Sequence, residues 1–432
     1  MSPLGDTATR TRAASRPAVD TDVAVVGGGP AGAAAAIGLA RAGRTVTLID
    51  KATFPRDKIC GDGLTAGALR QLERLGLEPS AVASWTRVDD VVVRSPSGRQ
   101  ITLPLPRGQG TYAAVARRID LDAALLDVAR RHGVEVLEGH ACTGVTEGPS
   151  GVELDVADLG ELRARWLVAA DGMWSPVRKH LGLATPGYRG EFHAFRQYFT
   201  NVGPRAAREL FVWFEPDLLP GYVWSFPLPD RQANVGFGIV RGGKVERVQE
   251  MARIWRELLD RPHIREVLGP DATAESPHRA WPIPARIDRA VLTSRRTLFV
   301  GDAAAATDCL TGEGIAQALL TGTLAAEAIG PRDRGPAAVT ADFRRAVRRE
   351  LLADHRLSAL LVRVMHHRKG VRGAIRLAGA TAWTRRNFAR WMFEDYPRAV
   401  LATPRRWHRH MLTGPGAYRT EPVGRTESLD RT

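Results

Sequence analysis

Cysteine is scarce in this sequence, which has only three in 432 residues, at positions 60, 142 and 309. Three are too few for the disulfide scaffold of a small secreted protein, and none is spaced with histidines as metal ligands are. We therefore expect a reducing compartment and no metal site. A P-loop, a Ser-His-Asp constellation and internal repeats are also missing from the sequence.

Long apolar runs are missing as well. No stretch approaches the roughly 20 apolar residues that span a bilayer, and residues 1–20 lack the apolar core of a signal peptide. Their low hydrophobicity predicts a disordered tail, and residues 414–432 have the same character. We expect a cytoplasmic protein.

Acidic residues are sparse near the C-terminus. The formal net charge is +14, and residues 341–432 hold 20 Lys and Arg against 8 Asp and Glu. Arginines alternate there with Trp, Phe and Leu, which predicts a basic helical region over residues 341–413. The region fits a peripheral helix on the anionic inner face of the cell membrane, and it equally fits a helical cap with a solvated basic face. No nucleic-acid motif accompanies the charge, so we expect no nucleic acid partner.

What the sequence does contain is a glycine-rich turn. An apolar strand-like run over residues 22–26 leads into Gly-Gly-Gly-Pro-Ala-Gly over 27–32, and residues 33–40 favour a helix. The first glycine permits a tight turn, the third lets the backbone approach a pyrophosphate, and the last allows close helix packing, while the helix N-terminus offers its amides to phosphates. The candidate cofactor-binding residues here are Gly27, Gly29, Ala31 and Gly32.

A second strand, Thr45–Ile49, ends in Asp50, about 20 residues beyond the glycines. An acid at this spacing is suited to accept hydrogen bonds from a ribose. Strand, turn, helix, strand and acid in this order predict a dinucleotide-binding site, and we include the neighbouring Lys51 among its candidates.

Two later motifs select the cofactor. Residues 167–178 contain Asp171-Gly172, and residues 298–304 contain Gly301-Asp302. Both resemble motifs of the large FAD-binding flavoprotein group that includes aromatic hydroxylases. The resemblance implies FAD as the cofactor, with Asp171 at the site and Asp302 against its ribityl and pyrophosphate part.

Arg118 matches an arginine that lies near the cofactor in this group. The alternative is a surface arginine that opens a helix over Leu121–Arg131, because arginines are mostly exposed.

Three further segments narrow the family: Phe54–Thr65, Pro220–Pro227 and Leu310–Ile315. Together and in order they resemble the geranylgeranyl reductase family, and within it the actinobacterial menaquinone reductases. The resemblance implies saturation of double bonds in an apolar isoprenoid-type substrate. It adds as cofactor-binding candidates Cys60, Gly61, Gly312, Gly314 and Ile315.

The middle segment carries an aromatic residue at every second position. Tyr222, Trp224 and Phe226 alternate along a predicted strand, so their rings should share one face, with Val223 and Ser225 on the other. An isoprenoid chain is held by apolar contact area, worth about 25 cal/mol per Å² buried. We predict an aromatic wall of the substrate site, with Tyr222 and Trp224 as catalytic candidates; an ordinary core strand is the alternative.

Cys60 is the third catalytic candidate. The resemblance places its loop beside the flavin, where a helix terminus or a cation such as Lys58 would lower the thiol pKa, and we predict a proton donor or flavin-tuning thiol. Cys309 stands where most relatives carry proline, which raises the hypothesis of a redox pair between Cys60 and Cys309; a free cysteine is more often an inert apolar residue. Cys142 is assigned to packing.

The expected fold class is α/β, with a Rossmann-type FAD-binding domain interleaved with an antiparallel β-sheet substrate domain, and then the helical C-terminal region. The FAD-binding domain is predicted over residues 21–90, 112–186 and 282–340. The substrate domain is predicted over residues 91–111 and 187–281.

We expect an FAD-dependent reductase of carbon–carbon double bonds in a polyprenyl substrate, with menaquinone as first choice and a geranylgeranyl group as second. Without a second dinucleotide fingerprint, the electron donor is either NADPH or a reduced ferredoxin. The main alternative is an FAD-dependent monooxygenase or oxidative tailoring enzyme on the same fold. A halogenase would need Trp-x-Trp-x-Ile-Pro, and residues 281–284 are only Trp-Pro-Ile-Pro. A flavin-binding sensor or electron carrier without a substrate is a further alternative. The oligomeric state is unknown from sequence.

Overall fold

The computed structural model describes residues 19–242, 248–330, 334–407 and 411–419. The predicted N-terminal tail lies outside them up to residue 18, as do residues 420–432 of the predicted C-terminal tail. Residues 414–419, which we had assigned to that tail, are packed: Ala417 is buried and forms a β-bridge with Thr111. The ordered chain therefore extends past the predicted boundary at residue 414.

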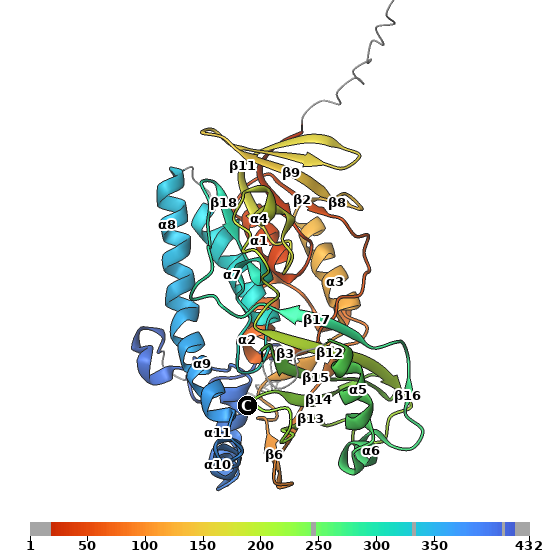
Figure 1. Cartoon of the computed structure of the whole chain (residues 1–432). Helices are drawn as coiled ribbons and strands as arrows, with labels where there is room; N and C mark the ends of the chain where they lie inside the picture. The colour runs from red at the N-terminus through yellow and green to blue at the C-terminus, as the bar shows by residue number, and fades with distance from the viewer. Residues whose placement is uncertain (1–18, 243–247, 331–333, 408–410, 420–432) are drawn as a thin grey trace, which may run out of the picture.

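The first sheet is the core of the upper half of the molecule (Figure 1). Its strand order is β8-β2-β1-β11-β10-β9, and β18 pairs with the C-terminal half of β11. β8, β2, β1, β11 and β18 pair in parallel, whereas β10 is antiparallel to both of its neighbours, β11 and β9. The strands are β1 (Val19–Val26), β2 (Val46–Asp50), β8 (Glu135–Glu138), β9 (Cys142–Glu147), β10 (Val152–Val156), β11 (Gly160–Ala169) and β18 (Thr297–Phe299).

Helices α1 (Pro30–Arg41), α3 (Arg118–Arg131) and α7 (Ile315–Ile329) pack in this half. Small residues bring α1 and α7 close together, since a Cβ on Gly322 would lie 2.1 Å from the carbonyl oxygen of Ala31. Any side chain at position 322 would push the helices apart. This contact fixes the start of α1 relative to α7.

The second sheet lies below the first and gathers strands from two parts of the chain (Figure 1). Its order is β16-β12-β15-β14-β13-β5-β6, with β17 also paired to β12, and the pairs are antiparallel except for β13 with β5. Helices α5 (Val248–Leu259) and α6 (Pro262–Leu268) cover one face. The strands are β5 (Asp90–Arg94), β6 (Gln100–Pro104), β12 (Phe192–Thr200), β13 (Leu210–Trp213), β14 (Tyr222–Leu228), β15 (Gln232–Val240), β16 (Thr273–Ala274) and β17 (Arg279–Ile283).

A small third sheet and several short helices complete the two halves. The sheet has the order β3-β7-β4. Its strands are β3 (Gly63–Thr65), β7 (Ala113–Val115) and β4 (Thr86–Arg87). The remaining helical elements outside the C-terminal region are α2 (Ala66–Leu75), α4 (Pro176–His180) and the 3₁₀ turns Pro79–Ala81 and Gly301–Ala304.

The C-terminal region is helical and packs on both halves. Phe343 of α8 is buried in the core of the first sheet, while Ile375 of α10 and Ala389 of α11 are buried in a cluster with β5 and β6. Figure 1 shows α10 and α11 at the lower left of the molecule. The elements are α8 (Pro336–Val347), a π-helical turn (Arg348–Leu352), α9 (Ala353–Met365), α10 (Arg368–Ala378), α11 (Ala382–Met392) and the 3₁₀ turns Val400–Ala402 and Pro404–Arg406.

The predicted fold class is confirmed: a mixed α/β chain with a Rossmann-type half, an antiparallel sheet and a C-terminal helical region. Within the described ranges, no helix has the length and apolar content needed to span a bilayer.

Candidate functional site

The glycine-rich turn joins β1 to α1, as predicted. Gly27 has a φ of +109°, and a Cβ there would lie 2.3 Å from the carbonyl oxygen of Ala170, so no other residue fits. A Cβ on Gly32 would lie 1.8 Å from the carbonyl oxygen of Gly27. The turn is therefore as tight as the sequence indicated, and the N-terminus of α1 opens beside it.

Two guanidinium groups lie over this turn. A Cβ on Gly29 would be 3.6 Å from Arg118 and 3.8 Å from Arg56. Both arginines pair with the fully buried Asp122, at 2.7 Å for Arg118 and 2.8 Å for Arg56. Arg118 is itself buried, so the alternative of a surface arginine is wrong. Two fixed cations at a helix N-terminus match a pyrophosphate.

Asp50 ends β2 beside the same turn. Its carboxylate accepts hydrogen bonds from the amides of Gly28, at 2.7 Å, and Ala52, at 2.8 Å. Lys51, the next candidate, is exposed. Asp50 is thus held at the edge of the turn, where we expect a ribose.

The two later motifs take up different positions. Gly301 has a φ of +58°, and a Cβ there would lie 3.0 Å from the Cβ of Ala31, which places Asp302 near the start of α1. Asp171 instead accepts hydrogen bonds from Ser175 at 2.7 Å and from the amide of Val177 at 2.9 Å. Its carboxylate therefore orders the start of α4, a role that the sequence did not indicate.

Residues 51–62, between β2 and β3, form what we call the Cys60 loop. It contacts both halves of the molecule, because Cys60 packs against the core of the first sheet and its carbonyl oxygen accepts a hydrogen bond from Asn234 of the second sheet. Burial, followed by the charge of Asp62, raises the pKa of the Cys60 thiol to about 11. The expectation of a pKa lowered by Lys58 is therefore wrong. The Lys58 ammonium lies 3.4 Å from the centre of the Trp281 ring, and burial lowers its own pKa to about 8. A thiol with so high a pKa keeps its proton at neutral pH.

Asp62, in the same loop, is a buried acid of the candidate site that was not among the residues predicted from the sequence. It is fully buried and accepts hydrogen bonds from Tyr198 and Asn234, both at 2.7 Å. Asn234 also donates to the carbonyl oxygen of Cys60, at 2.8 Å, and accepts from the Trp224 indole, at 3.0 Å. Asp62 and Asn234 therefore connect the Cys60 loop to the second sheet.

The aromatic side chains of β14 share one face, as the period-two pattern predicts. The rings of Tyr222, Trp224 and Phe226 follow one another with centroids 6.1 Å apart at each step. Val223 points to the opposite face, into the cluster under α5 and α6. We call the three rings the aromatic wall; two of them face the Cys60 loop, since a Cβ on Gly61 would lie 3.4 Å from Phe226 and 3.7 Å from Trp224.

Tyr222 joins the wall to the loop before α7. Its hydroxyl donates a short hydrogen bond to the carbonyl oxygen of Thr311, and a Cβ on Gly312 would lie 3.5 Å from that hydroxyl. Burial, aided by Glu313 and Asp308, raises the pKa of Tyr222. Gly314 caps α7 and Ile315 begins it, so these candidates stand at the helix N-terminus.

Glu313 was not among the predicted site residues. Burial, followed by the nearby charge of Glu394, raises its pKa to about 8, although the amide of Ala316 donates a hydrogen bond to it at 2.8 Å. Burial also raises the pKa of Glu394, which lies just beyond α11 and accepts from Gln317 at 2.8 Å. The C-terminal region thus contributes a carboxyl group to this part of the site.

The structure does not join Cys60 to Cys309, and all three cysteines are free thiols. The Cys309 thiol is buried and faces the carbonyl oxygen of His355 in α9, at 3.9 Å. Burial raises its pKa to about 12.

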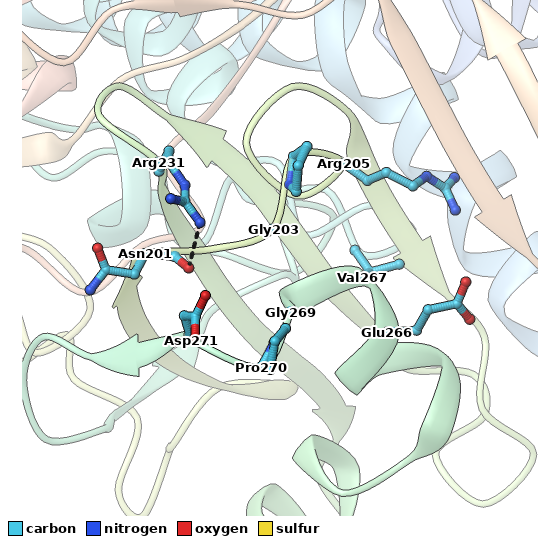
Figure 2. Close-up of a pocket in the computed structure, with 10 residues that line it drawn as sticks. Asn201, Gly203, Arg205, Arg231, Glu266, Val267, Gly269, Pro270 and Asp271 are labelled. Atoms are coloured by element: carbon cyan, nitrogen blue, oxygen red, sulfur yellow. Dashed lines mark hydrogen bonds between the residues drawn. The ribbon is translucent and has the colours of Figure 1, made fainter.

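A cavity of about 210 Å³ lies apart from this site, where the chain leaves β12 and α6 ends (Figure 2). None of the predicted site residues lines it. Its lining brings charges of both signs together, which is a poor match for an apolar ligand. The charged residues are Arg205, Arg231, Glu266 and Asp271.

Comparison with known proteins agrees with the geometry. A family model described as an FAD binding domain matches residues 20–330. The chain is 34% identical over 338 residues to menaquinone reductase of Mycobacterium tuberculosis, covering 72% of this chain and 77% of the relative. It is 32% identical over 316 residues to digeranylgeranylglycerophospholipid reductase 2 of Methanopyrus kandleri, covering 72% and 76%. The chain belongs to the geranylgeranyl reductase family of FAD-dependent oxidoreductases.

A solved structure supports the fold of this family member. The geranylgeranyl bacteriochlorophyll reductase-like protein from Thermoplasma acidophilum matches with a TM-score of 0.75 at 22% identity, covering 90% of this chain and all of the other. FAD is the cofactor of the family, and the paired guanidiniums over the glycine turn fit its pyrophosphate.

We predict that iodoacetamide alkylates Cys60 in the folded protein at pH 8 about 100-fold more slowly than an ordinary exposed cysteine, because a pKa of about 11 leaves little thiolate. Peptide mass spectrometry over a time course measures the rate. Protein unfolded in guanidinium chloride is the control, in which the three cysteines should react at ordinary rates. Fast labelling of Cys60 in the folded protein would contradict the raised pKa.

We also predict a pH-dependent effect of Glu313→Gln. The folded-state pKa of about 8 lies above the ordinary 4.5, so the native protein loses stability as pH rises through this window, whereas glutamine does not titrate. Between pH 5 and pH 8 the Tm of the variant should therefore rise relative to that of the unchanged protein, by roughly 1 °C for each kcal/mol of stability recovered. Thermal unfolding of the FAD-loaded proteins measures this. The exposed Glu266→Gln is the control and should follow the unchanged protein; identical curves for Glu313→Gln would disprove the prediction.

Proposed function

We propose that this chain is an FAD-dependent reductase that saturates carbon–carbon double bonds of a polyprenyl substrate. The observation that carries the proposal is the aromatic wall, placed directly against the Cys60 loop. A Cβ on Gly63, which directly follows the loop, would lie only 3.1 Å from Phe226, so loop and wall are in close contact. An apolar wall beside a redox cofactor suits a substrate that offers contact area rather than hydrogen bonds.

We propose menaquinone as the first substrate and a geranylgeranyl group as the second. The support is the order of the relatives, since a menaquinone reductase matches at 34% identity and a digeranylgeranylglycerophospholipid reductase at 32%. For the electron donor, NADPH and a reduced ferredoxin-type protein are both candidates, because the sequence holds a single dinucleotide fingerprint.

When bound in its reduced form, FAD would supply the hydride that adds to one carbon of the double bond. The residues of this chain must align the alkene and protonate its other carbon, because isolated alkenes resist hydride. Cys60 is the proposed proton donor, and its pKa of about 11 keeps the proton on sulfur until it is needed. Tyr222 is the second candidate for this step. Trp224, whose indole is fixed by Asn234, would orient the substrate.

The test is a mass measurement. The purified protein, reduced with dithionite under anaerobic conditions, is incubated with menaquinone and, separately, with geranylgeranyl lipids. After the quinone ring has been re-oxidised in air, we expect a product that is still heavier by two hydrogens, and the accepted lipid identifies the substrate. Oxygen incorporation that requires air and NADPH, with no gain of hydrogen, would replace the proposal with the monooxygenase alternative.

Two single cysteine variants make this test more specific. Cys60→Ala should lower kcat by about 100-fold or more if the thiol delivers the proton. Cys142→Ala, at a buried cysteine in β9, is the matched control and should retain activity. Equal activity of the two variants would move the proton-donor role to Tyr222.

We further propose that helices α9–α11 contact an anionic membrane surface. Although α10 buries Val371 and Ile375, large apolar side chains on these helices are left exposed. They are Leu360 at 54%, Val364 at 47%, Leu377 at 71% and Trp383 at 63% of full exposure. The same helices carry exposed basic residues, namely Arg363, Arg368, Lys369, Arg372, Arg376 and Arg386. Exposed apolar and basic side chains on the same helices are typical of interfacial binding, with each basic residue contributing about 1 kcal/mol.

Vesicle flotation tests this surface. The protein should float with vesicles that contain phosphatidylglycerol and remain behind with vesicles of phosphatidylcholine alone. The double variant Arg372→Glu/Arg376→Glu should weaken flotation by at least about tenfold. Arg131→Glu/Arg256→Glu, which reverses two exposed charges on α3 and α5, is the control and should bind as the unchanged protein does. Equal loss in both double variants would disprove a localised membrane surface.

A further inference from the structure

The C-terminal region inserts one arginine into the site. Arg398 lies after α11 and is only 3% exposed. Its guanidinium donates to Thr311 Oγ1 and Glu394 Oε1, both at 3.0 Å, and forms a short ion pair with Asp308. One buried cation thus holds two residues of the loop before α7, together with a carboxyl group of its own segment.

Asp308 organises that loop, which we call the 308–313 loop. One carboxylate oxygen accepts from the amides of Leu310 at 3.0 Å and Thr311 at 2.9 Å, and from the Thr311 hydroxyl at 3.0 Å. The other accepts from Ser358 of α9 at 2.7 Å. Burial alone would raise the pKa of Asp308, but the charge of Arg398 and these hydrogen bonds lower it. The loop is therefore built around an ionised carboxylate whose counter-ion comes from the C-terminal region.

The loop in turn anchors the aromatic wall. The carbonyl oxygen of Thr311 accepts the hydrogen bond of the Tyr222 hydroxyl, and Gly312, with a φ of +70°, passes directly beside it. A displacement of the loop would move both the first ring of the wall and the residues expected at the cofactor.

We propose that Arg398 is a positioning residue for the reaction: it fixes the 308–313 loop and, through Thr311, the hydroxyl of Tyr222 relative to the cofactor. This inference rests on the proposed reductase function for its kinetic consequence. Alignment of reacting atoms is sensitive to displacements of about 1 Å, so a loosened loop should lower turnover more than substrate binding.

The chain offers a matched control. Arg390, in α11, is 5% exposed and also forms a short ion pair, with Asp395, but its other partners are the carbonyl oxygens of Leu412 and Gly414. None of these belongs to the 308–313 loop. Arg390→Lys and Arg398→Lys therefore make the same change in equally buried ion pairs, and only the second touches the loop.

The experiment compares these two variants as FAD-loaded, full-length proteins. We expect the two variants to lower Tm by similar amounts, because each replaces a planar guanidinium, which has several hydrogen-bond donors, with a single ammonium. Arg398→Lys should lower kcat between about tenfold and 100-fold with KM changed less than about threefold, and it should shift the visible absorbance band of bound FAD. Arg390→Lys should keep both kcat and the absorbance band.

Thr311→Val tests the same link while retaining the ion pair of Arg398 with Asp308. It should shift the flavin band and lower kcat with a Tm near that of the unchanged protein, and it decides the matter if Arg398→Lys does not fold. An unshifted band in Thr311→Val, or equal kcat and equal bands in the two lysine variants, would overturn the proposal. The absorbance band needs no substrate, so this readout remains decisive even if the unchanged protein fails to reduce a polyprenyl lipid.

Discussion

The buried carboxylate of Asp62 is the interaction on which the rest of the site depends. It lies in the Cys60 loop, yet both of its hydrogen-bond donors, Tyr198 and Asn234, come from the second sheet. Burial raises its pKa to about 6 despite these hydrogen bonds and the charge of Arg196, and within the described part of the chain its Oδ1 has no hydrogen-bond partner. Burying a carboxyl group is costly, and the hydrogen bonds from Tyr198 and Asn234 offset part of that cost while they tie the loop to the second sheet.

Asp62 also explains why the thiol and the wall are found together. Asn234 bonds simultaneously to Asp62, to the backbone of Cys60 and to the Trp224 indole. The loop that carries the thiol and the strand that carries the rings are therefore positioned by the same amide. A substrate held against the wall is held against the Cys60 loop for the same reason, and neither element can shift alone without breaking this network.

Local patterns in the sequence predicted the fold class, the glycine turn and the shared face of Tyr222, Trp224 and Phe226, because each follows from backbone geometry over a few residues. The contact between Asp62 and Asn234 follows from no such pattern. The two residues are 172 positions apart, and a single polar residue in a sequence does not indicate which distant residue it will contact. The pKa of Cys60 was predicted in the wrong direction for a similar reason. Lys58 is close in sequence, but the fold turns its ammonium onto the Trp281 ring and leaves burial to determine the thiol.

The basic residues of the C-terminal region fall into a buried group and an exposed group. Arg390 and Arg398 turn inward to Asp395 and Asp308, so part of the excess of basic residues counted in the sequence is neutralised inside the protein. The arginines of α10 are exposed, and so is Leu377 of the same helix. The buried face of this region therefore forms a helical cap, and the exposed basic face is the surface for which we propose membrane contact. Arg398 joins the buried face of this region to the 308–313 loop, whose Thr311 carbonyl oxygen holds the Tyr222 hydroxyl, so the helical cap and the candidate site are parts of one packed structure.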